Sequence, residues 1–358
     1  MQTAKKYYAG IDIGGTKIAF GIVGEDRKLL TRRSMPTDPD CPFEATVREM
    51  AGAVKAAAAE AGLEAGQIAS VGIGVPSTVD PETGRVVFAN NLGWRDLDLT
   101  GEFKKHWDLP VYLENDADCA ALAESMEGPA AGKNVLVITV GTGFGGGLIM
   151  NGRIFKGGDN SGFEPGHSAL VFGGEPCTCG QRGCVEAYAS VTALIRQTRE
   201  KMEARRESLL WRECGGDLAK VDGRTPFNAA KQGDAAAAEV VKGYTEYLAA
   251  GIANLVTLFR PRMVILGGGI SEEGEYLLGP LRKSAESRIY AADILSMPPL
   301  VKARLGNDAG VIGAALLGAV PPKSPDSGGA DKPGATNSPA AQGDAAGRET
   351  GPETGGRA

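Results

Sequence analysis

Two segments of the chain follow the same plan, and this repetition limits the possible folds more than any other feature of the sequence. Residues 7–23 read YYAGIDIGGTKIAFGIV, two apolar β-rich runs joined by a turn at Gly14-Gly15. Residues 135–149 read VLVITVGTGFGGGLI and are followed by an Asn151-Gly152 hairpin signal and a further short strand. Apolar runs joined by tight glycine turns predict strand–turn–strand units. We therefore expect an internally duplicated chain.

Helical and strand patterns fill the remainder of the chain up to about residue 318. Helices are expected over residues 44–61, 116–125, 185–206, 226–231, 235–258, 272–289 and 309–317, and strands over 69–75, 111–113 and 263–266. Mixed strands and helices in two similar halves predict an α/β protein of two lobes with a ligand cleft between them. We expect one lobe to hold residues 1–117 plus 309–320 and the other to hold residues 118–308.

Composition restricts the partners of the chain. Of its 358 residues, 42% are hydrophobic and 23% are charged, which is enough for two domains with separate cores. The 38 basic and 44 acidic residues give a net charge of −6 without a basic stripe, so we expect no binding to nucleic acid or to a membrane. No apolar run reaches the roughly 20 residues of a membrane helix, and the N-terminus lacks a signal peptide pattern. We expect a cytoplasmic protein with small-molecule ligands.

The final segment, residues 321–358, differs in composition from the rest. It contains no Leu, Ile, Val, Met, Phe, Tyr or Trp. Such a segment cannot bury enough apolar area to offset the entropy lost on ordering. We therefore expect a disordered tail without a specific role.

Three glycine-rich loops follow predicted strands. The first, Asp12–Lys17, and the second, Thr139–Gly147, carry groups suited to phosphate, and the third, Gly267–Gly269, could flank a base or ribose. The first, Asp12 to Lys17, offers a carboxylate, two glycines that allow close backbone approach, a hydroxyl and an ammonium. It is not a Walker A loop, because GxxxxGK[ST] is absent and a strand follows. Equivalent loops in a duplicated fold favour one nucleotide held between the lobes, although the first loop could be only a hairpin turn and the third only a tight turn. The residues expected to bind ATP are Asp12, Gly14, Gly15, Thr16, Lys17, Thr142, Gly143, Gly267, Gly268 and Gly269.

Three of the six cysteines are close together in the sequence. Cys177, Cys179 and Cys184 follow His167 and supply, with it, one imidazole and three thiolates. These four groups make a complete tetrahedral zinc set, which has no room for an activated water. We therefore expect a structural zinc ion in a loop spanning residues 167–184. The alternative is four unrelated buried residues.

Five motifs follow one another along the chain: Asp12–Lys17, Glu114–Ala117, Thr142–Gly147, Glu164–His167 and Cys177–Glu186. In this order they resemble the motifs of the ROK family of sugar kinases and repressors. The resemblance covers about residues 7–318 and is greatest to bacterial ATP-dependent glucokinases. It implies the two-lobed, actin-like, hexokinase-type ATPase fold with duplicated ribonuclease H-like domains. Pro165 departs from the pattern, since many members carry a branched or aliphatic residue there, and it removes a backbone donor beside two site residues.

The resemblance also implies roles for individual residues. Asp116 matches the family's catalytic base, and its place between an apolar strand and a helix suits an ionised carboxylate, although it equally suits an N-cap. The positions that match the family's sugar contacts are Asn91, Asn115, Asp116, Glu164, His167 and Glu186. The residues alone also allow an Asn-rich turn at Asn91 and solvated acids at Glu164 and Glu186. In the family, the metal fixes the loop that presents His167 and Glu186 to the sugar.

The expected function is ATP-dependent phosphorylation of the 6-hydroxyl of glucose, with Asp12 acting through a Mg²⁺ ion that keeps most of its waters. Alternatives within the family are kinases for N-acetylmannosamine, N-acetylglucosamine or fructose. A sugar-sensing repressor is disfavoured, because only eleven residues precede Asp12 where those members carry a helix-turn-helix. An inactive sugar-binding protein is disfavoured because Asp12, Lys17 and Asp116 are retained. We expect a homodimer or a homotetramer.

Overall fold

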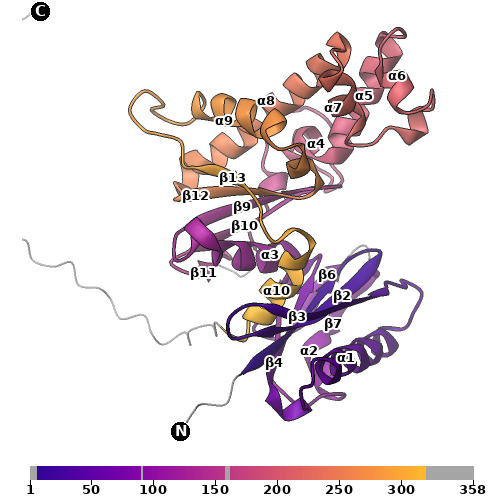
Figure 1. Ribbon diagram of the computed structural model, residues 1–358, viewed down its shortest axis with the longest axis vertical. Helices are drawn as coiled ribbons and strands as arrows, with labels where there is room; N and C mark the ends of the chain where they lie inside the picture. The colour runs from indigo at the N-terminus through magenta and orange to yellow at the C-terminus, as the bar shows by residue number, and fades with distance from the viewer. Residues whose placement is uncertain (1–5, 90–91, 158–161, 320–358) are drawn as a thin grey trace, which may run out of the picture. The chain divides into compact units, whose positions relative to one another are not determined.

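Two five-stranded sheets of the same topology form the framework of the protein (Figure 1). The computed structural model describes residues 6–89, 92–157 and 162–319, which belong to one compact unit, Met1–Pro321. The first sheet has the strand order β3-β2-β1-β4-β8, and the second has the order β11-β10-β9-β12-β13. In each sheet the first three strands are antiparallel and the remaining two pair in parallel. This correspondence confirms the predicted internal duplication.

The strands are short and mostly apolar. The first sheet consists of β1 (Tyr7–Ile13), β2 (Lys17–Gly24), β3 (Leu29–Pro36), β4 (Ile68–Val75) and β8 (Val111–Asn115). The second consists of β9 (Val135–Val140), β10 (Phe144–Met150), β11 (Arg153–Ile154), β12 (Met263–Gly267) and β13 (Leu300–Lys302). A small antiparallel sheet holds β5 (Thr78–Asp80), β6 (Arg85–Ala89) and β7 (Trp94–Asp98).

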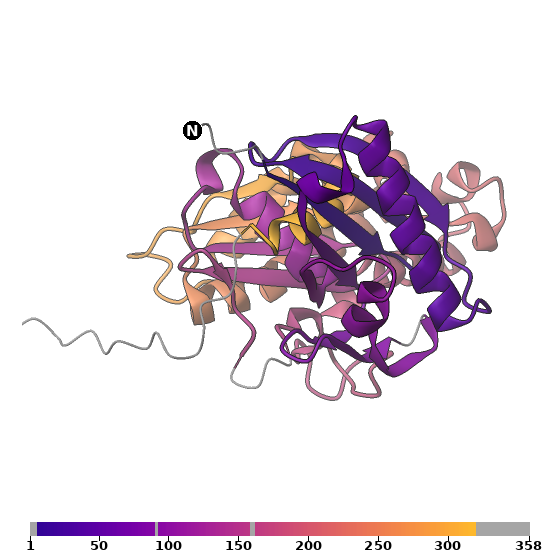
Figure 2. The same cartoon turned by 90° about the horizontal axis from the view of Figure 1, so that it is seen from below.

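The helices lie between and around these sheets. They are α1 (Phe43–Glu60), α2 (Leu99–Lys104), α3 (Asp116–Ser125), α4 (Glu186–Ala189), α5 (Val191–Ala204), α6 (Leu210–Glu213), α7 (Thr225–Lys231), α8 (Ala235–Phe259), α9 (Glu275–Glu286) and α10 (Ala309–Leu316). Helix α1 buries Val47, Met50 and Val54 at helical spacing and so packs one apolar face on the first sheet. Figure 2 shows α1, in dark violet, lying across that sheet.

Helices α3 and α10 pack against each other between the two large sheets (Figure 1). Their core joins Leu122 of α3 and Ile312 of α10 to strand residues of both sheets, such as Val23 and Val135. Glycines allow this close approach: a Cβ on Gly313 would lie 1.7 Å from the carbonyl oxygen of Cys119. The last element of the fold is thereby fixed beside the helix that begins at Asp116.

The structure corrects one predicted helix. Residues 185–206 were expected to form a single helix, but the chain breaks between α4 and α5 at Ser190. Ser190 is extended, with φ −79° and ψ 165°, and its Oγ accepts a hydrogen bond from the backbone N–H of Ala193 at 3.1 Å. A serine in this conformation caps a new helix rather than continuing the previous one.

The structure does not test the predicted lobe boundaries, the predicted role of Asn91 or the predicted tail. The contacts group residues 1–321 into one unit, so the lobe boundaries at 117 and 309 stay predictions. Both Asn91 and the tail at residues 321–358 lie outside the described residues.

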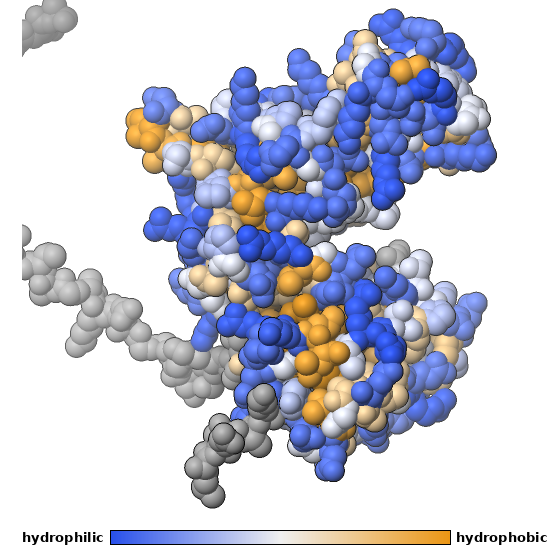
Figure 3. Space-filling model, viewed as in Figure 1, coloured by the Kyte–Doolittle hydropathy of each residue, from blue (hydrophilic) through white to orange (hydrophobic). Residues whose placement is uncertain are grey.

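Hydrophilic side chains cover most of the face shown in Figure 3, with apolar residues exposed in smaller patches between them. Within the described ranges, no helix combines the length and apolar character needed to cross a membrane.

Candidate active site

The carboxyl end of β8 and the start of α3 carry two predicted site residues. Asn115 is the N-cap of α3, because its Oδ1 accepts hydrogen bonds from the backbone N–H groups of Ala117 at 2.8 Å and of Asp118 at 3.2 Å. The alternative in which Asp116 caps the helix is therefore wrong. Asp116 is instead the first residue of α3 and is half-buried.

The ionisation of Asp116 reflects its surroundings. Burial raises the pKa of the Asp116 carboxyl, and a hydrogen bond from the backbone N–H of Ala117, 2.8 Å long, acts in the opposite direction. A carboxyl group with a raised pKa accepts a proton more readily than an exposed aspartate does. Asp116 thus takes up a proton at a higher pH than an exposed aspartate does.

Asp12 lies near Asp116 on the same edge of the first sheet. Strand β4 separates β1 from β8, and the carboxyl ends of these three parallel strands meet at that edge. Burial, followed by the charge of Asp116, raises the pKa of Asp12 to about 6, while Lys17 and Arg32 oppose the rise. The carboxylate of Asp12 abuts the start of α10, where a Cβ on Gly310 would lie 2.3 Å from its Oδ2.

The first glycine loop is a turn whose backbone is held by hydrogen bonds. The N–H of Gly14 donates to the carbonyl of Lys17 at 2.9 Å, and the hydroxyl of Thr37 donates to the carbonyl of Gly14 at 2.7 Å. Gly15, Thr16 and Lys17 are exposed. The hairpin turn and a phosphate-facing loop are thus compatible, since the turn presents its hydroxyl and ammonium groups to solvent.

The second and third glycine loops are neighbours. Gly268 has φ +82°, and a Cβ there would lie 2.2 Å from the carbonyl oxygen of Val140, which ends β9 and belongs to the second loop. Only glycine fits this position without strain. In the second loop, the hydroxyl of Thr192 donates to the carbonyl of Thr142 at 2.7 Å and links that loop to α5.

A cavity of about 370 Å³ opens beside the third loop. Its lining comes from α3, the second sheet, the third loop and the start of α10: Ala120, Glu124, Val137, Thr139, Gly267, Gly268, Gly269, Ser271, Glu272, Ala303, Gly306, Asn307 and Ala309. Gly310, next to Ala309, meets the carboxylate of Asp12. The start of α10 therefore connects this cavity to the first glycine loop, whereas Thr142 and Gly143 are not among the lining residues.

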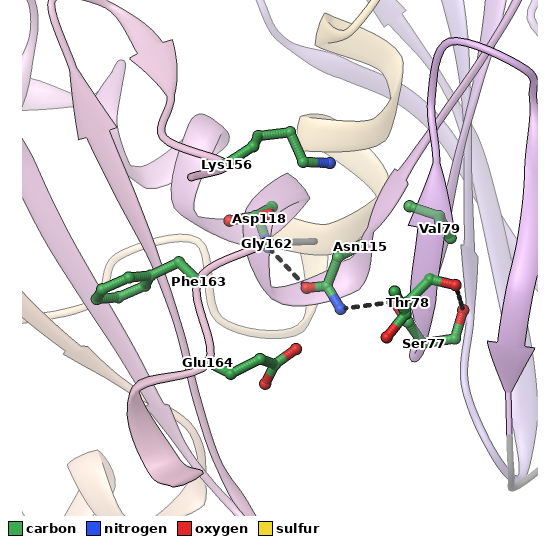
Figure 4. Close-up of a pocket in the computed structure, with 9 residues that line it drawn as sticks. All are labelled: Ser77, Thr78, Val79, Asn115, Asp118, Lys156, Gly162, Phe163 and Glu164. Atoms are coloured by element: carbon green, nitrogen blue, oxygen red, sulfur yellow. Dashed lines mark hydrogen bonds between the residues drawn. The ribbon is translucent and has the colours of Figure 1, made fainter. Parts of the chain in front are cut away.

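A second, smaller pocket lies at the start of α3 (Figure 4). It is lined by Ser77, Thr78, Val79, Asn115, Asp118, Lys156, Gly162, Phe163 and Glu164. In Figure 4 the side chains of Asn115 and Glu164 point into the same space from opposite sides. Two predicted sugar contacts from distant parts of the chain are therefore brought together.

Asn115 has limited hydrogen-bonding capacity left for a ligand. Its Oδ1 already accepts two backbone bonds, and its Nδ2 donates to the carbonyl of Ser77 at 3.2 Å. An amide nitrogen has two N–H donors, so one donor remains available. Asn115 can thus donate to a sugar hydroxyl, but it cannot form the bidentate contact that a free amide would.

The carboxyl group of Glu164 interacts electrostatically with that of Asp116. Packing around its carboxyl raises the pKa of Glu164; His167 lowers it, and the charges of Asp116 and Glu186 raise it. Four predicted site residues thus lie close enough to influence one another's charge.

The four predicted metal ligands converge. The ligand atoms of His167, Cys177, Cys179 and Cys184 all lie within 4.8 Å of one another. The Sγ atoms of Cys179 and Cys184 are 3.7 Å apart, and the Sγ of Cys177 is 3.6 Å from Nδ1 of His167. The alternative of four unrelated residues is wrong.

Glu186 connects the cysteine cluster to the second glycine loop. Its Oε2 accepts a hydrogen bond from the backbone N–H of Phe144 at 3.0 Å, and its Oε1 accepts one from the hydroxyl of Thr178 at 3.2 Å. A Cβ on Gly143 would lie 2.5 Å from that Oε2. The short α4 therefore holds this carboxylate between the two loops.

Sequence reasoning missed some residues that line the smaller pocket. Lys156, Asp118 and the Ser77–Val79 segment were assigned no role, and Glu114 appeared only as part of a motif. The sequence signal for Asp118 is weak, because its position two residues after Asp116 is equally typical of a helix surface. No local signal predicts Lys156, whose contact with Glu114 bridges 42 residues.

The sequence is similar to those of known proteins over most of its length. The sequence profile of the ROK family matches residues 8–319. The chain belongs to the ROK family. A glucokinase from Streptomyces coelicolor is 38% identical over 87% of this chain and 97% of its own length, and an N-acetyl-D-glucosamine kinase from Aliivibrio salmonicida is 32% identical over 87% and 99%.

A solved ROK structure shares the fold. The crystal structure of a ROK family glucokinase from Streptomyces griseus, in complex with glucose and AMPPNP, is 37% identical and has a TM-score of 0.74. The alignment covers 87% of this chain and 98% of that chain. The expected actin-like, hexokinase-type ROK fold is confirmed, with its two sheets of equal topology.

Proposed function

We propose that this ROK protein transfers the γ-phosphoryl group of ATP to the 6-hydroxyl of glucose, with Asp116 as general base. The chain is an ATP-dependent hexose kinase, because glucokinases at 38% and 36% identity align over 87% and 86% of it. Glucose as the preferred sugar and Asp116 as the base go further than that. The observation that carries them is the position of Asp116, half-buried at the start of α3 beside the pocket of Asn115 and Glu164.

The chemistry requires a hydroxyl oxygen made nucleophilic at the right place. Asp116 takes the proton of the 6-hydroxyl while that oxygen attacks the γ-phosphorus, and ADP leaves in line. Asn115, Glu164 and His167 hold the other hydroxyls, so that the attacking oxygen faces the phosphate. Asn91 is assigned to the same site by the family resemblance.

The nucleotide is assigned to the cavity at the third glycine loop, with its phosphates toward the first and second loops. Asp12 would hold a Mg²⁺ ion through its waters, since a carboxylate beside a phosphate loop suits this hard cation. The ion, when bound, neutralises charge on the phosphates. Gly14, Gly15, Thr16 and Lys17 are placed to contact the same groups.

The cysteine cluster is assigned to a structural zinc ion. Two thiolates at about 2.3 Å from a tetrahedral zinc lie about 3.8 Å apart, close to the 3.7 Å between Cys179 and Cys184. His167 and Cys177 complete the set, which leaves no position for a reactive water. The ion would fix the segment that carries His167 and Glu186.

A panel of sugars in a coupled ADP-release assay tests the preferred substrate. We expect the highest kcat/KM with glucose. The second candidate is N-acetylglucosamine, because a kinase of that sugar is 32% identical over 87% of the chain. A higher kcat/KM for N-acetylglucosamine, N-acetylmannosamine or fructose would overturn the assignment to glucose.

The assembly of the chain into a homodimer or a homotetramer stays a prediction.

A further inference from the structure

The least exposed ion pair among the described residues joins Lys156 to Glu114. Their side chains are 14% and 6% exposed. Every other described ion pair has at least one partner exposed by 27% or more. Burying two charges carries a desolvation penalty that their attraction often fails to exceed, so a buried pair is weak support for a stabilising role. Its position is therefore more informative.

The pair joins two segments that carry proposed sugar-site residues. Glu114 is the penultimate residue of β8 in the first sheet, two residues before Asp116, and its Oε1 also accepts the backbone N–H of Asn115 at 2.8 Å. Lys156 follows β11 of the second sheet, and its carbonyl accepts the N–H of Gly162 at 3.2 Å. Glu164 comes two residues later. The pair thus connects the end of β8, next to the proposed base Asp116, to the part of the chain that leads to Glu164.

Lys156 is also the one cationic side chain among the residues lining the smaller pocket, against two acids, Asp118 and Glu164 (Figure 4). Asp118 is 2% exposed, and its Oδ1 has no hydrogen-bond partner among the described residues. Burial and the charge of Glu114 raise the pKa of Asp118, and Lys156 opposes that rise. Without the ammonium, this pocket would hold only acidic charge.

We infer that Lys156 is a positioning residue for the sugar site. By pairing with Glu114, it holds the segment that carries Glu164 against the end of β8, where Asn115 and Asp116 lie. The inference rests on the proposed hexose-kinase function. Lys156 need not touch the substrate. Its loss leaves the Glu114 carboxylate buried without its counter-charge and removes the contact by which Lys156, hydrogen-bonded to Gly162, is held to β8.

The test compares Lys156→Met with wild type in steady-state assays with glucose, together with calorimetric Kd values for glucose. We expect the glucose KM and Kd to rise by about tenfold or more, as for truncation of one partner of a buried charge pair. The ATP KM should change by less than about twofold, because the nucleotide loops lie elsewhere. Lys156→Arg should restore most of the glucose affinity. Lys201→Met breaks the exposed pair between Lys201 of α5 and Glu239 of α8; it is the matched control and should leave both constants unchanged.

A double-mutant cycle separates this role from general stability. The double variant Lys156→Met/Glu114→Gln removes the unpaired charge and should fold even if Lys156→Met does not. Its glucose KM should be no higher than that of the single variant with the higher glucose KM. Unaltered glucose constants in Lys156→Met, equal rises in both KM values, or effects that multiply in the double variant would each overturn the inference. If the wild type shows no turnover of any hexose, the proposed function fails, and the calorimetric Kd for glucose still decides on Lys156; no glucose binding to wild type overturns both.

Discussion

Asp12 and Asp116 share the edge of one sheet, and their proximity shapes the chemistry of the site. Burial raises the pKa of both carboxyl groups, and for Asp12 the charge of Asp116 adds to the rise, to a value of about 6. Two ionised carboxylates in such a place destabilise the fold relative to the unfolded chain. A protein that keeps them accepts lower stability in return for a site that attracts cations and protons.

Replacing Asp12 with Asn should therefore raise the melting temperature at pH 8 and change it little at pH 4. A carboxyl group whose folded-state pKa is raised contributes stability below its ordinary pKa of 3.8, and that contribution is lost as pH rises through about 6. At pH 8 the variant lacks the buried charge, and we expect a gain of about 2–4 °C. Thermal unfolding followed by circular dichroism measures it, with exposed Asp40→Asn as control. An equal shift at both pH values would contradict the explanation.

Asp116→Asn should keep the fold and glucose affinity but lower kcat by about two or more orders of magnitude. The substitution preserves shape while removing the group that accepts the proton. Asp217→Asn changes an aspartate that caps a short helix away from both pockets and should retain full kcat. Steady-state rates together with a calorimetric glucose Kd make the comparison. More than half the wild-type kcat in Asp116→Asn would remove Asp116 as the base.

Turns and caps, at the scale of elements, determine where these side chains point. Asn115 caps α3, so that Asp116 is the first residue of the helix rather than its cap, whereas Ser190 ends one helix and starts the next so that Glu186 remains on a short α4. Gly268 allows the third loop to approach the end of β9. Each of these is a local backbone feature with a direct effect on a binding group.

Gly268→Ala should raise the ATP KM severalfold and leave the glucose Kd within twofold, because a Cβ at φ +82° would collide with the carbonyl of Val140 beside the nucleotide cavity. Gly52→Ala, inside α1, is the matched control: a Cβ there would meet nothing within 4 Å, and we expect a gain in stability of about 0.5–1 kcal/mol. Kinetics and urea unfolding compare the two variants. Unchanged ATP KM in Gly268→Ala would show that the loop is only a turn.

The cysteine loop should bind about one zinc ion per chain, and Cys179→Ser should lose it. We expect a lower melting temperature and a larger rise in the glucose KM than in the ATP KM, because His167 is both a ligand and a proposed sugar contact. Cys41→Ser, outside the cluster, should keep its zinc. Elemental analysis finding no zinc in active enzyme would refute the site. Zinc loss with an unaltered glucose KM would separate the metal from sugar recognition.

At the scale of the whole molecule, the parts of the fold that local patterns determine could be predicted from the sequence. The two strand–turn–strand units at β1–β2 and β9–β10, and helices α1, α3, α8 and α10, lie where periodicity and glycine turns place them. The small sheet of β5–β7 and strand β13 were missed, because three to five residues carry too little pattern. The break at Ser190 was hidden by apolar spacing that continues across it.

The site was predictable where motifs are contiguous. Asn115, Asp116 and the four proposed zinc ligands stand in short motifs with their own chemistry. Lys156 has no such signal, because its pairing with Glu114 depends on how the second sheet meets the first, and tertiary contacts of this kind leave no local pattern.

The most direct test of the whole account is to identify the product formed from ATP and glucose by purified wild-type protein. We predict that ADP release depends on glucose and that phosphorus-31 and proton NMR show glucose 6-phosphate as the sugar product. An equal amount of the Asp116→Asn variant should form at most about one hundredth as much of this product in the same time. ADP release that does not depend on glucose, or a phosphoryl group at another hydroxyl, would contradict the central claim.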